Sequence, residues 1–139
     1  VGILPAVLLV DAPCVIENVP DVTDIRLILE IMTSLGAKCE RDGDTVRIDP
    51  TGVDTYVANS ERMSRLRGSY YFIGALLGRF GQAEVSLPGG CNFGLRPIDQ
   101  HLKGFAALGA KTKIQHGLIK AHAEKLEGSH IYLDINNSL

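Results

Sequence analysis

The chain has 139 residues, of which 45% are hydrophobic and 22% are charged, and its formal net charge is −2 at pH 7. This charge, together with the lack of a Lys/Arg run, argues against a nucleic acid as the main partner. No apolar stretch reaches the ~18 residues that a membrane-spanning helix needs, so we expect no membrane segment. The three cysteines are odd in number and far apart, which fits a reducing cytoplasm better than a disulfide framework.

The first part of the chain predicts two helices and three strands. These are a helix over residues 2–10, a strand over 14–19, a helix over 21–35, and strands over 38–41 and 45–48. Thr23 or Asp24 can cap the second helix, and Gly36 can end it in the left-handed conformation. The last two strands alternate around Asp42-Gly43, which is a strong hairpin signal.

The rest of the chain follows the same order. We expect a helix over residues 62–80, a strand over 83–87, a helix over 96–108, a hairpin over 111–122 and a further strand over 131–133. Gly109 ends the second of these helices, and the hairpin turns near His116-Gly117. We interpret the aromatic run at residues 70–72 as core rather than as a surface on which bases stack.

An internal repeat explains this order. The segment Leu-Gly-Ala-Lys occurs at residues 35–38 and again at 108–111, an offset of 73. Earlier in the chain the offset is 68, as shown by the matching pairs Leu8-Leu9 with Leu76-Leu77 and Val19-Pro20 with Leu87-Pro88. The second copy has therefore gained about five residues where a strand passes to a helix, within residues 88–94.

The repeat predicts the domain organisation. We expect an α/β fold in which residues 1–139 are part of one domain, built from two repeat units at about 1–50 and 51–139. Neither unit can bury both of its faces alone, so the two units are expected to share a core.

The inserted loop is the main candidate for a reactive site. Glycines at positions 89, 90 and 94 allow the backbone to approach a small ligand closely, and Cys91 stands among them. Arg96-Pro97 opens the next helix, and the first turn of a helix favours a phosphate or carboxylate. A thiol beside that turn and a guanidinium is expected to be reactive. The alternative is a tight turn in which Cys91 only fills space.

Charged residues after the loop are further candidates. Arg96 can clamp an anion with two hydrogen bonds. Asp99 either contacts a ligand or simply matches the dipole of its helix. His101 either binds a substrate or faces solvent.

A second group of basic residues, Arg62, Arg65 and Arg67, is expected at the start of a helix, where the dipole opposes them. One of them then reaches an anionic ligand, or the group is a solvated face paired with Glu61. The other two cysteines, Cys14 and Cys39, lie in strand-like surroundings and are expected to be inert. The four histidines lack metal-ligand spacing, so we expect no metal site.

The run at residues 87–101 carries a family resemblance. It reads Leu-Pro-Gly-Gly-Cys-Asn-Phe-Gly-Leu-Arg-Pro-Ile-Asp-Gln-His. It resembles the UDP-N-acetylglucosamine enolpyruvyl transferases (1-carboxyvinyltransferases), which catalyse the first committed step of peptidoglycan synthesis. The similarity extends through essentially the whole chain, including residues 16–20, 67–69 and 130–134 and both Leu-Gly-Ala-Lys segments.

The resemblance implies a fold and an activity. The fold is an inside-out α/β barrel of repeated βαβαββ units, in which two domains close on the substrates. The activity is transfer of the enolpyruvyl group from phosphoenolpyruvate to the 3′-hydroxyl of UDP-N-acetylglucosamine, without a cofactor, in the bacterial cytoplasm. The expected partners are these two substrates and the second domain of the same enzyme, with neither nucleic acid nor membrane.

The resemblance also implies roles for single residues. Cys91 matches a general acid that acts on phosphoenolpyruvate and can form a covalent adduct with it. Arg96 matches an arginine that contacts the phosphate of phosphoenolpyruvate. The substrate-binding positions are Arg67, Arg96, Pro97, Ile98, Asp99, Gln100 and His101.

The sequence departs from the family in three places. The family's Lys-Asn pair would precede Val1, and its third repeat and second domain are absent from this sequence. The family's Ser-Val-Gly-Ala-Thr run is replaced by Ile-Asn-Asn-Ser-Leu at residues 135–139. We therefore expect the chain to be part of the cysteine-bearing domain and to be close to inactive alone.

Two alternatives remain open. The sister enolpyruvyl transferase of the shikimate pathway shares the fold, although the Pro-Gly-Gly-Cys loop disfavours it. A non-catalytic repeat module that binds a nucleotide-sugar or a partner protein is the other alternative. Phosphate release measured with each acceptor separates the three hypotheses.

Overall fold

A computed structural model describes residues 1–87 and 98–133. Its first elements are α1 (Ile3–Ala6), which continues as the 3-10 helix η1 (Val7–Leu9), then β1 (Cys14–Ile16), α2 (Thr23–Ser34), β2 (Lys38–Asp42) and β3 (Thr45–Asp49). The remaining elements are β4 (Val57–Ala58), α3 (Glu61–Arg65), α4 (Tyr70–Phe80), β5 (Gln82–Ser86), α5 (Asp99–Ala107), β6 (Lys111–Gln115) and β7 (Leu118–His122).

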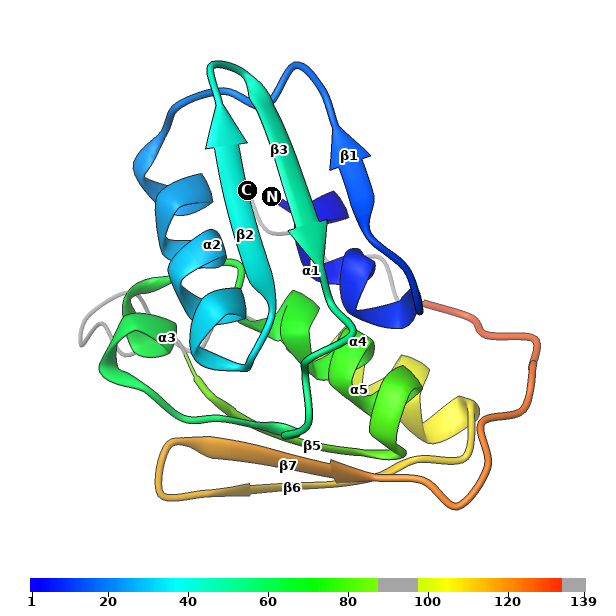
Figure 1. The fold of residues 1–139 in the computed structure, drawn as a ribbon. Helices are drawn as coiled ribbons and strands as arrows, with labels where there is room; N and C mark the ends of the chain where they lie inside the picture. Colours follow the sequence, from blue (N-terminus) through cyan, green and yellow to red (C-terminus); the bar gives the residue numbers. More distant parts are fainter. Residues whose placement is uncertain (88–97, 134–139) are drawn as a thin grey trace.

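The strands form two sheets. The first has the order β1-β3-β2 and is antiparallel throughout. The second has the order β4-β5-β7-β6, in which only the short strand β4 runs parallel to its neighbour. Figure 1 shows the two sheets at opposite sides of the molecule, with α1, α4 and α5 between them.

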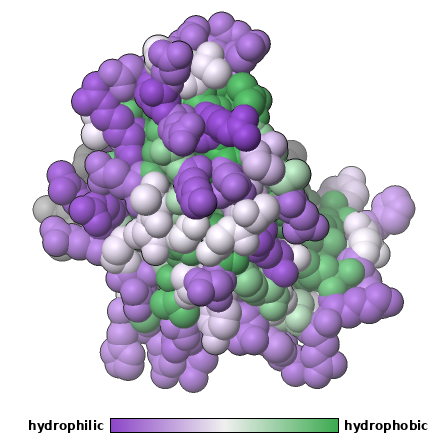
Figure 2. All heavy atoms as spheres, viewed as in Figure 1, coloured by the Kyte–Doolittle hydropathy of each residue, from purple (hydrophilic) through white to green (hydrophobic). Residues whose placement is uncertain are grey.

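The core fills the space between the sheets. Buried side chains alternate along β3 and β7, and they meet the buried faces of α2 and α4. The largest of these fully buried side chains include Phe72, Ile28, Met32, Leu76, Ile48 and Ile119. The opposite faces of the strands carry polar side chains, and the lower edge of the molecule, where β6 and β7 lie, is hydrophilic in Figure 2. Burial on one face only gives each strand its period of two.

Equivalent hydrogen bonds recur in the two halves. Ala37 N donates to Met32 O at 3.0 Å, and Ala110 N donates to Phe105 O at 2.9 Å, at the offset of 73. Val19 N donates to Asp44 O, and Leu87 N donates to Gly117 O, both at 2.8 Å. In the second pair of bonds, the donors Val19 and Leu87 are related by the offset of 68, and the acceptors Asp44 and Gly117 by the offset of 73. Both halves also pair their first strand with their third and their third with their second.

Both hairpins turn through two residues. Gly43 (φ 58°) and Asp44 lie between β2 and β3, so the loop is one residue later than the expected Asp42-Gly43. His116 (φ 50°) and Gly117 (φ 74°) lie between β6 and β7, as expected. In the second hairpin both loop positions have positive φ, which is typical of the turn whose twist matches that of the flanking strands, whereas in the first hairpin only Gly43 does.

The side chain of Arg79 joins the two halves. Its Nη1 donates to the carbonyl of Leu8 at 2.9 Å and to that of Val10 at 3.4 Å, and its Nη2 donates to Pro50 O at 3.2 Å. These carbonyls lie at the end of η1 and at the start of the connection between the halves. Helix ends leave carbonyls without intrahelical donors, and a guanidinium from α4 satisfies them here.

The expected single helix over residues 62–80 is wrong. It divides into α3 and α4, because Leu66 is extended (φ −86°, ψ 117°) and buries its side chain completely. The turn after Leu66 brings Gly68 against Val1 and Tyr71, where a Cβ would lie 3.0 Å from Val1 Cγ1 and 3.2 Å from Tyr71 Cδ2. Long-range packing therefore overrides the helical spacing of this segment.

Other element predictions also need correction. The first helix is α-helical only as far as Ala6 and then tightens to 3-10 geometry. The cap position of α2 is Val22, without a side-chain cap, rather than Thr23 or Asp24. Residues 131–133 do not form a strand, and Tyr132 is 92% exposed. Among the helices of the described residues, none is long and apolar enough to cross a membrane.

Candidate functional site

The structure describes five of the eight residues assigned to the site. Cys91, Arg96 and Pro97 lie outside the described residues. Ile98, Asp99, Gln100 and His101 lie at the start of α5, and Arg67 lies in the turn before α4. The candidate site is therefore considered from these two segments.

The start of α5 presents polar side chains to solvent. The helix begins at Asp99 with Ile98 at its cap position, so it starts later than the expected residue 96. Asp99 and His101 are exposed, whereas Ile98 and Gln100 are half-buried. The Asp99 carboxylate in the first turn suits the positive end of the helix dipole. Dipole matching alone thus accounts for Asp99, and a ligand contact remains a prediction.

The arginines near α3 are placed differently from the expectation. Ser60 Oγ accepts a hydrogen bond from Met63 N at 3.3 Å and so caps α3. Arg62 and Arg65 fall in the last turn of this short helix, where the dipole favours them. Arg62 pairs with Glu30 of α2 at 2.9 Å, and not with Glu61. Arg67 alone stands beyond α3, and it is exposed.

An aromatic contact joins the two segments. The Tyr70 ring, at the start of α4, lies 4.7 Å from the His101 ring, between centroids, with 53° between the ring planes. Tyr70 also lies 4.8 Å from the ring of Tyr71. Further along the two helices a Cβ on Gly74 would be 3.7 Å from Phe105 Cε1, so α4 and α5 pack closely. The first turn of α4, which begins three residues after Arg67, is thereby in contact with the first turn of α5.

The aromatic run at residues 70–72 is only partly core. Phe72 is fully buried, as expected, but Tyr71 is 43% exposed. Tyr70 is half-buried, packs against the edge of the core and contacts His101 of α5. The interpretation as core is therefore confirmed for Phe72, holds in part for Tyr70 and is wrong for Tyr71, because successive residues of a helix point in different directions.

The repeat shows why the Tyr70–His101 contact is unusual. At the offset of 73, His101 takes the place of Ile28, which is completely buried in α2. At the offset of 68, Tyr70 takes the place of Gly2. The first unit thus has glycine and isoleucine where the second has two polar rings. Sequence reasoning missed Tyr70, although comparing the two copies position by position would have identified it.

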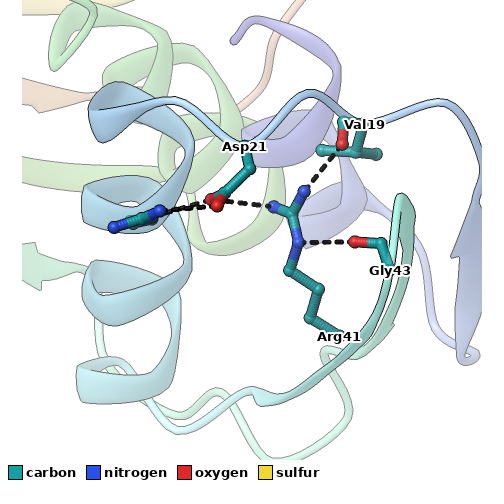
Figure 3. A network of polar contacts seen from close by, with 5 residues as sticks. Val19, Asp21, Arg41 and Gly43 are labelled. Carbon is teal, nitrogen blue, oxygen red and sulfur yellow. Dashed lines mark hydrogen bonds and ion pairs between the residues drawn. The ribbon is translucent and has the colours of Figure 1, made fainter.

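In the first unit, polar contacts of Arg41 hold the connection between β1 and α2 against the hairpin (Figure 3). Arg41 of β2 donates from Nε to Gly43 O at 2.9 Å and from Nη2 to Val19 O at 2.8 Å. Its Nη1 lies 4.0 Å from Asp21 Oδ1, and Asp21 also accepts two hydrogen bonds from Arg26. The hydrogen bonds from Arg26 lower the pKa of Asp21. A single arginine thus ties the end of the β1 connection to the hairpin.

The second unit has no arginine at the position that matches Arg41. Ile114 occupies the position of Arg41 at the offset of 73, and its side chain has no hydrogen-bond donor. The corresponding junction, residues 88–97, lies outside the described residues. Cys91 therefore belongs to the connection of the second unit, in which β6 has isoleucine where β2 has Arg41.

The two described cysteines lie in strands. Cys14 is in β1 and Cys39 in β2, and both are half-buried. Burial raises the pKa of the Cys39 thiol, which keeps it protonated and weakens it as a nucleophile. Within residues 1–87 and 98–133, no three His, Cys, Asp or Glu side chains are grouped so that they could hold a metal ion.

Comparison with known proteins gives the family. The family model described as EPSP synthase (3-phosphoshikimate 1-carboxyvinyltransferase) matches residues 2–138. UDP-N-acetylglucosamine 1-carboxyvinyltransferase 3 of Caldanaerobacter subterraneus subsp. tengcongensis is 54% identical over 135 residues, which are 97% of this chain and 32% of the relative. UDP-N-acetylglucosamine 1-carboxyvinyltransferase 2 of Clostridium acetobutylicum is 54% identical over 136 residues, with the same shares. The chain thus spans about a third of the length of these relatives.

A solved structure supports the fold. The enolpyruvyl transferase NikO from Streptomyces tendae superposes with a TM-score of 0.76 at 26% sequence identity, over 90% of this chain and 27% of that one. The expected enolpyruvyl transferase-like α/β fold is confirmed. On its sequence and on its fold, the chain belongs to the EPSP synthase family of carboxyvinyltransferases.

Proposed function

We propose that the protein carrying this chain transfers the enolpyruvyl group of phosphoenolpyruvate to the 3′-hydroxyl of UDP-N-acetylglucosamine. This is the first committed step of peptidoglycan synthesis, and we place it in the bacterial cytoplasm. The observation that carries the proposal is 54% identity, over 97% of the chain, to two proteins named for this acceptor. The run at residues 87–101, with Cys91 among its glycines, supports it from the sequence.

The reaction sets the roles of the residues. The 3′-oxygen bonds to C2 of phosphoenolpyruvate, its proton passes to a base, and an acid protonates the methylene carbon. Elimination then removes a proton from that carbon and breaks the bond to phosphate, which leaves as the second product. We assign the acid to Cys91 and one cationic contact of the phosphate to Arg96. A base is not evident in this chain, and we expect it from the second domain.

The described residues suit the nucleotide-sugar. Arg67 is exposed and can meet a diphosphate, while Asp99 offers an exposed acceptor and His101 an exposed ring nitrogen in the first turn of α5. A UDP-sugar offers both a diphosphate and hydroxyl groups. Together with Ile98 and Gln100, these residues form the proposed acceptor site, next to the loop that carries Cys91.

Phosphate release from the complete gene product tests the proposal. With phosphoenolpyruvate present, UDP-N-acetylglucosamine should support turnover, whereas shikimate 3-phosphate should not. The second acceptor is included because the matching family model carries that enzyme's name. Turnover only with shikimate 3-phosphate would show that the proposed acceptor is wrong. No turnover with either acceptor would favour a non-catalytic binding module.

Substitution of Cys91 tests its proposed role as the general acid. Positioned acids and bases contribute roughly 10²–10⁴ in rate, so Cys91→Ala should lower kcat by that order. Cys39→Ala is the matched control, because Cys39 lies in a strand and burial raises its pKa. The electrophile fosfomycin, a covalent inhibitor of the resembled family, should label Cys91 before Cys14 or Cys39. Labelling mainly at either strand cysteine would remove Cys91 from this role.

A further inference from the structure

The contact between Tyr70 and His101 is the feature that the proposed roles leave unexplained. The centroid distance of 4.7 Å and the tilt of 53° fall in the range that aromatic pairs prefer. His101 nevertheless remains exposed, so the contact does not bury the imidazole. A core contact would do the reverse, as Ile28 does at the matching position of the first unit.

An exposed ring that packs against a neighbour is restrained before a ligand arrives. Freezing a side chain upon binding costs about 0.5–1.5 kcal/mol, and a partner ring removes part of that cost in advance. Tyr70 is itself supported, because its other ring neighbour is Tyr71 at 4.8 Å. Tyr71 in turn lies beside Gly68, next to the exposed Arg67. The ladder Tyr71–Tyr70–His101 thus connects the Arg67 turn with the first turn of α5.

We infer that Tyr70 is a positioning residue for the nucleotide-sugar: it holds the His101 imidazole, and with it the first turn of α5, in the orientation that the acceptor meets. The inference rests on the proposed function, since it concerns the acceptor of that reaction. It adds a residue that acts through His101 and makes no claim that Tyr70 touches the reacting atoms. The repeat supports it, because the second unit has rings where the first has Gly2 and Ile28.

Kinetics of two Tyr70 variants test the inference in the complete gene product. Tyr70→Leu removes the ring, so KM for UDP-N-acetylglucosamine should rise roughly 2- to 10-fold, the range expected for loss of one aromatic pair, with kcat little changed. Tyr70→Phe keeps the ring, so its KM should stay closer to that of the unsubstituted enzyme than to that of Tyr70→Leu. Tyr56→Leu is the matched control: Tyr56 is also half-buried and pairs with one ring, that of Phe80 at 6.4 Å, away from the site.

A spectroscopic measurement follows the contact itself. A ring at 4.7 Å shifts the NMR signals of the carbon-bound imidazole protons of His101 through its ring current. Tyr70→Phe should retain this shift, and Tyr70→Leu should abolish it. A general loss of folding would instead disturb signals throughout the molecule, which separates a folding defect from loss of the contact.

The outcomes are distinguishable. If the unsubstituted enzyme turns over UDP-N-acetylglucosamine and Tyr70→Leu has an unchanged KM, the inference is wrong while the proposed function stands. If Tyr70→Phe raises KM as much as Tyr70→Leu, the hydroxyl rather than the ring is responsible, and the inference is again wrong. If the unsubstituted enzyme does not use this acceptor, the proposed function fails and the inference fails with it.

Discussion

Gly36 is a position where one methyl group has a large steric consequence. Its φ is 108°, and a Cβ there would lie 2.5 Å from the carbonyl oxygen of Gly52. Gly43 is a matched position, because its φ is also positive, at 58°, but a Cβ there would meet nothing within 4 Å. Comparing the two separates the cost of the backbone conformation from the cost of the close approach.

Alanine at these two glycines should therefore differ in effect. Gly43→Ala should lower the free energy of unfolding by roughly 1–2 kcal/mol, the cost of the left-handed conformation for a residue with a side chain. Gly36→Ala should lower it by a further amount of roughly 1–3 kcal/mol, because the backbone of residue 52 must move. Urea unfolding of both variants measures the difference. Equal losses of stability would show that the backbone around Gly52 moves away from an added Cβ at residue 36 with little cost in free energy.

Asp21 gives a prediction for acid stability. Hydrogen bonds from Arg26 lower its pKa below 3.8, so the folded state binds this proton less tightly than the unfolded state does. The resulting stabilisation is fully present above the unfolded pKa and is lost as the pH falls through the folded pKa. Asp21→Asn should thus be less stable than the unsubstituted protein at pH 7, and the difference should shrink below pH 3.8. A difference that is constant from pH 7 to pH 2 in urea unfolding would contradict this.

Between elements, Arg79 is the side chain whose loss should matter most for the contact between the two halves. Its guanidinium satisfies the carbonyls of Leu8, Val10 and Pro50. Arg79→Ala leaves these acceptors without their donor and should cost about 1–3 kcal/mol of the free energy of unfolding. Arg62→Ala is the control, since the Arg62–Glu30 pair is exposed and should contribute less than about 1 kcal/mol. Equal losses for both variants would mean that the carbonyls find water instead.

Helices and hairpins with local signals were predictable from the sequence. The spacing of Ile25, Leu29 and Met32 and the glycine after residue 35 locate α2 closely, and His116-Gly117 locates the second hairpin. The division between α3 and α4 was not predictable, because it depends on burial of Leu66 and on the approach of Gly68 to Val1. Such contacts join residues far apart in the sequence and leave no local pattern.

The candidate site was predictable in its residues but not in its geometry. The sequence run indicates the residues from Asp99 to His101, and the short Arg-Gly-Ser segment indicates Arg67. That the two segments are neighbours follows from a contact between Tyr70 and His101, whose partners lie on different helices. In the sequence, this contact is indicated only when each residue is compared with its counterpart in the other copy of the repeat.

On the scale of the whole molecule, we predict that the two units superpose. Residues 2–49 should overlay on residues 68–122, with the mismatch confined to residues 88–94, because equivalent hydrogen bonds recur at offsets of 68 and 73. A crystal structure that includes the loop measures this directly. Cys91 inside a continuous helix or strand would contradict the expected insertion.

The 139 residues produced alone should bind phosphoenolpyruvate weakly and release no phosphate. The chain spans 32% of its carboxyvinyltransferase relatives. Under the proposed function, we expect the base and further phosphate contacts from outside this chain. The complete gene product, titrated in parallel, is the control. Equal affinity for the two proteins, without loss on Arg96→Ala, would show that the anion is held elsewhere.

The contrast between Arg41 and Ile114 bears on how a duplicated unit can acquire chemistry. In the first copy, additional residues between Val19 and Asp21 would pull acceptors away from a guanidinium that also secures the hairpin. In the second copy, the aliphatic side chain of Ile114 imposes no such penalty on a longer connection. The connection in the first copy is thus constrained in length by Arg41, whereas Ile114 places no such constraint on the connection in the second copy. For an engineer, residues 88–94 are accordingly the place to graft a new reactive loop, and the turn at residues 19–21 is the place to leave untouched.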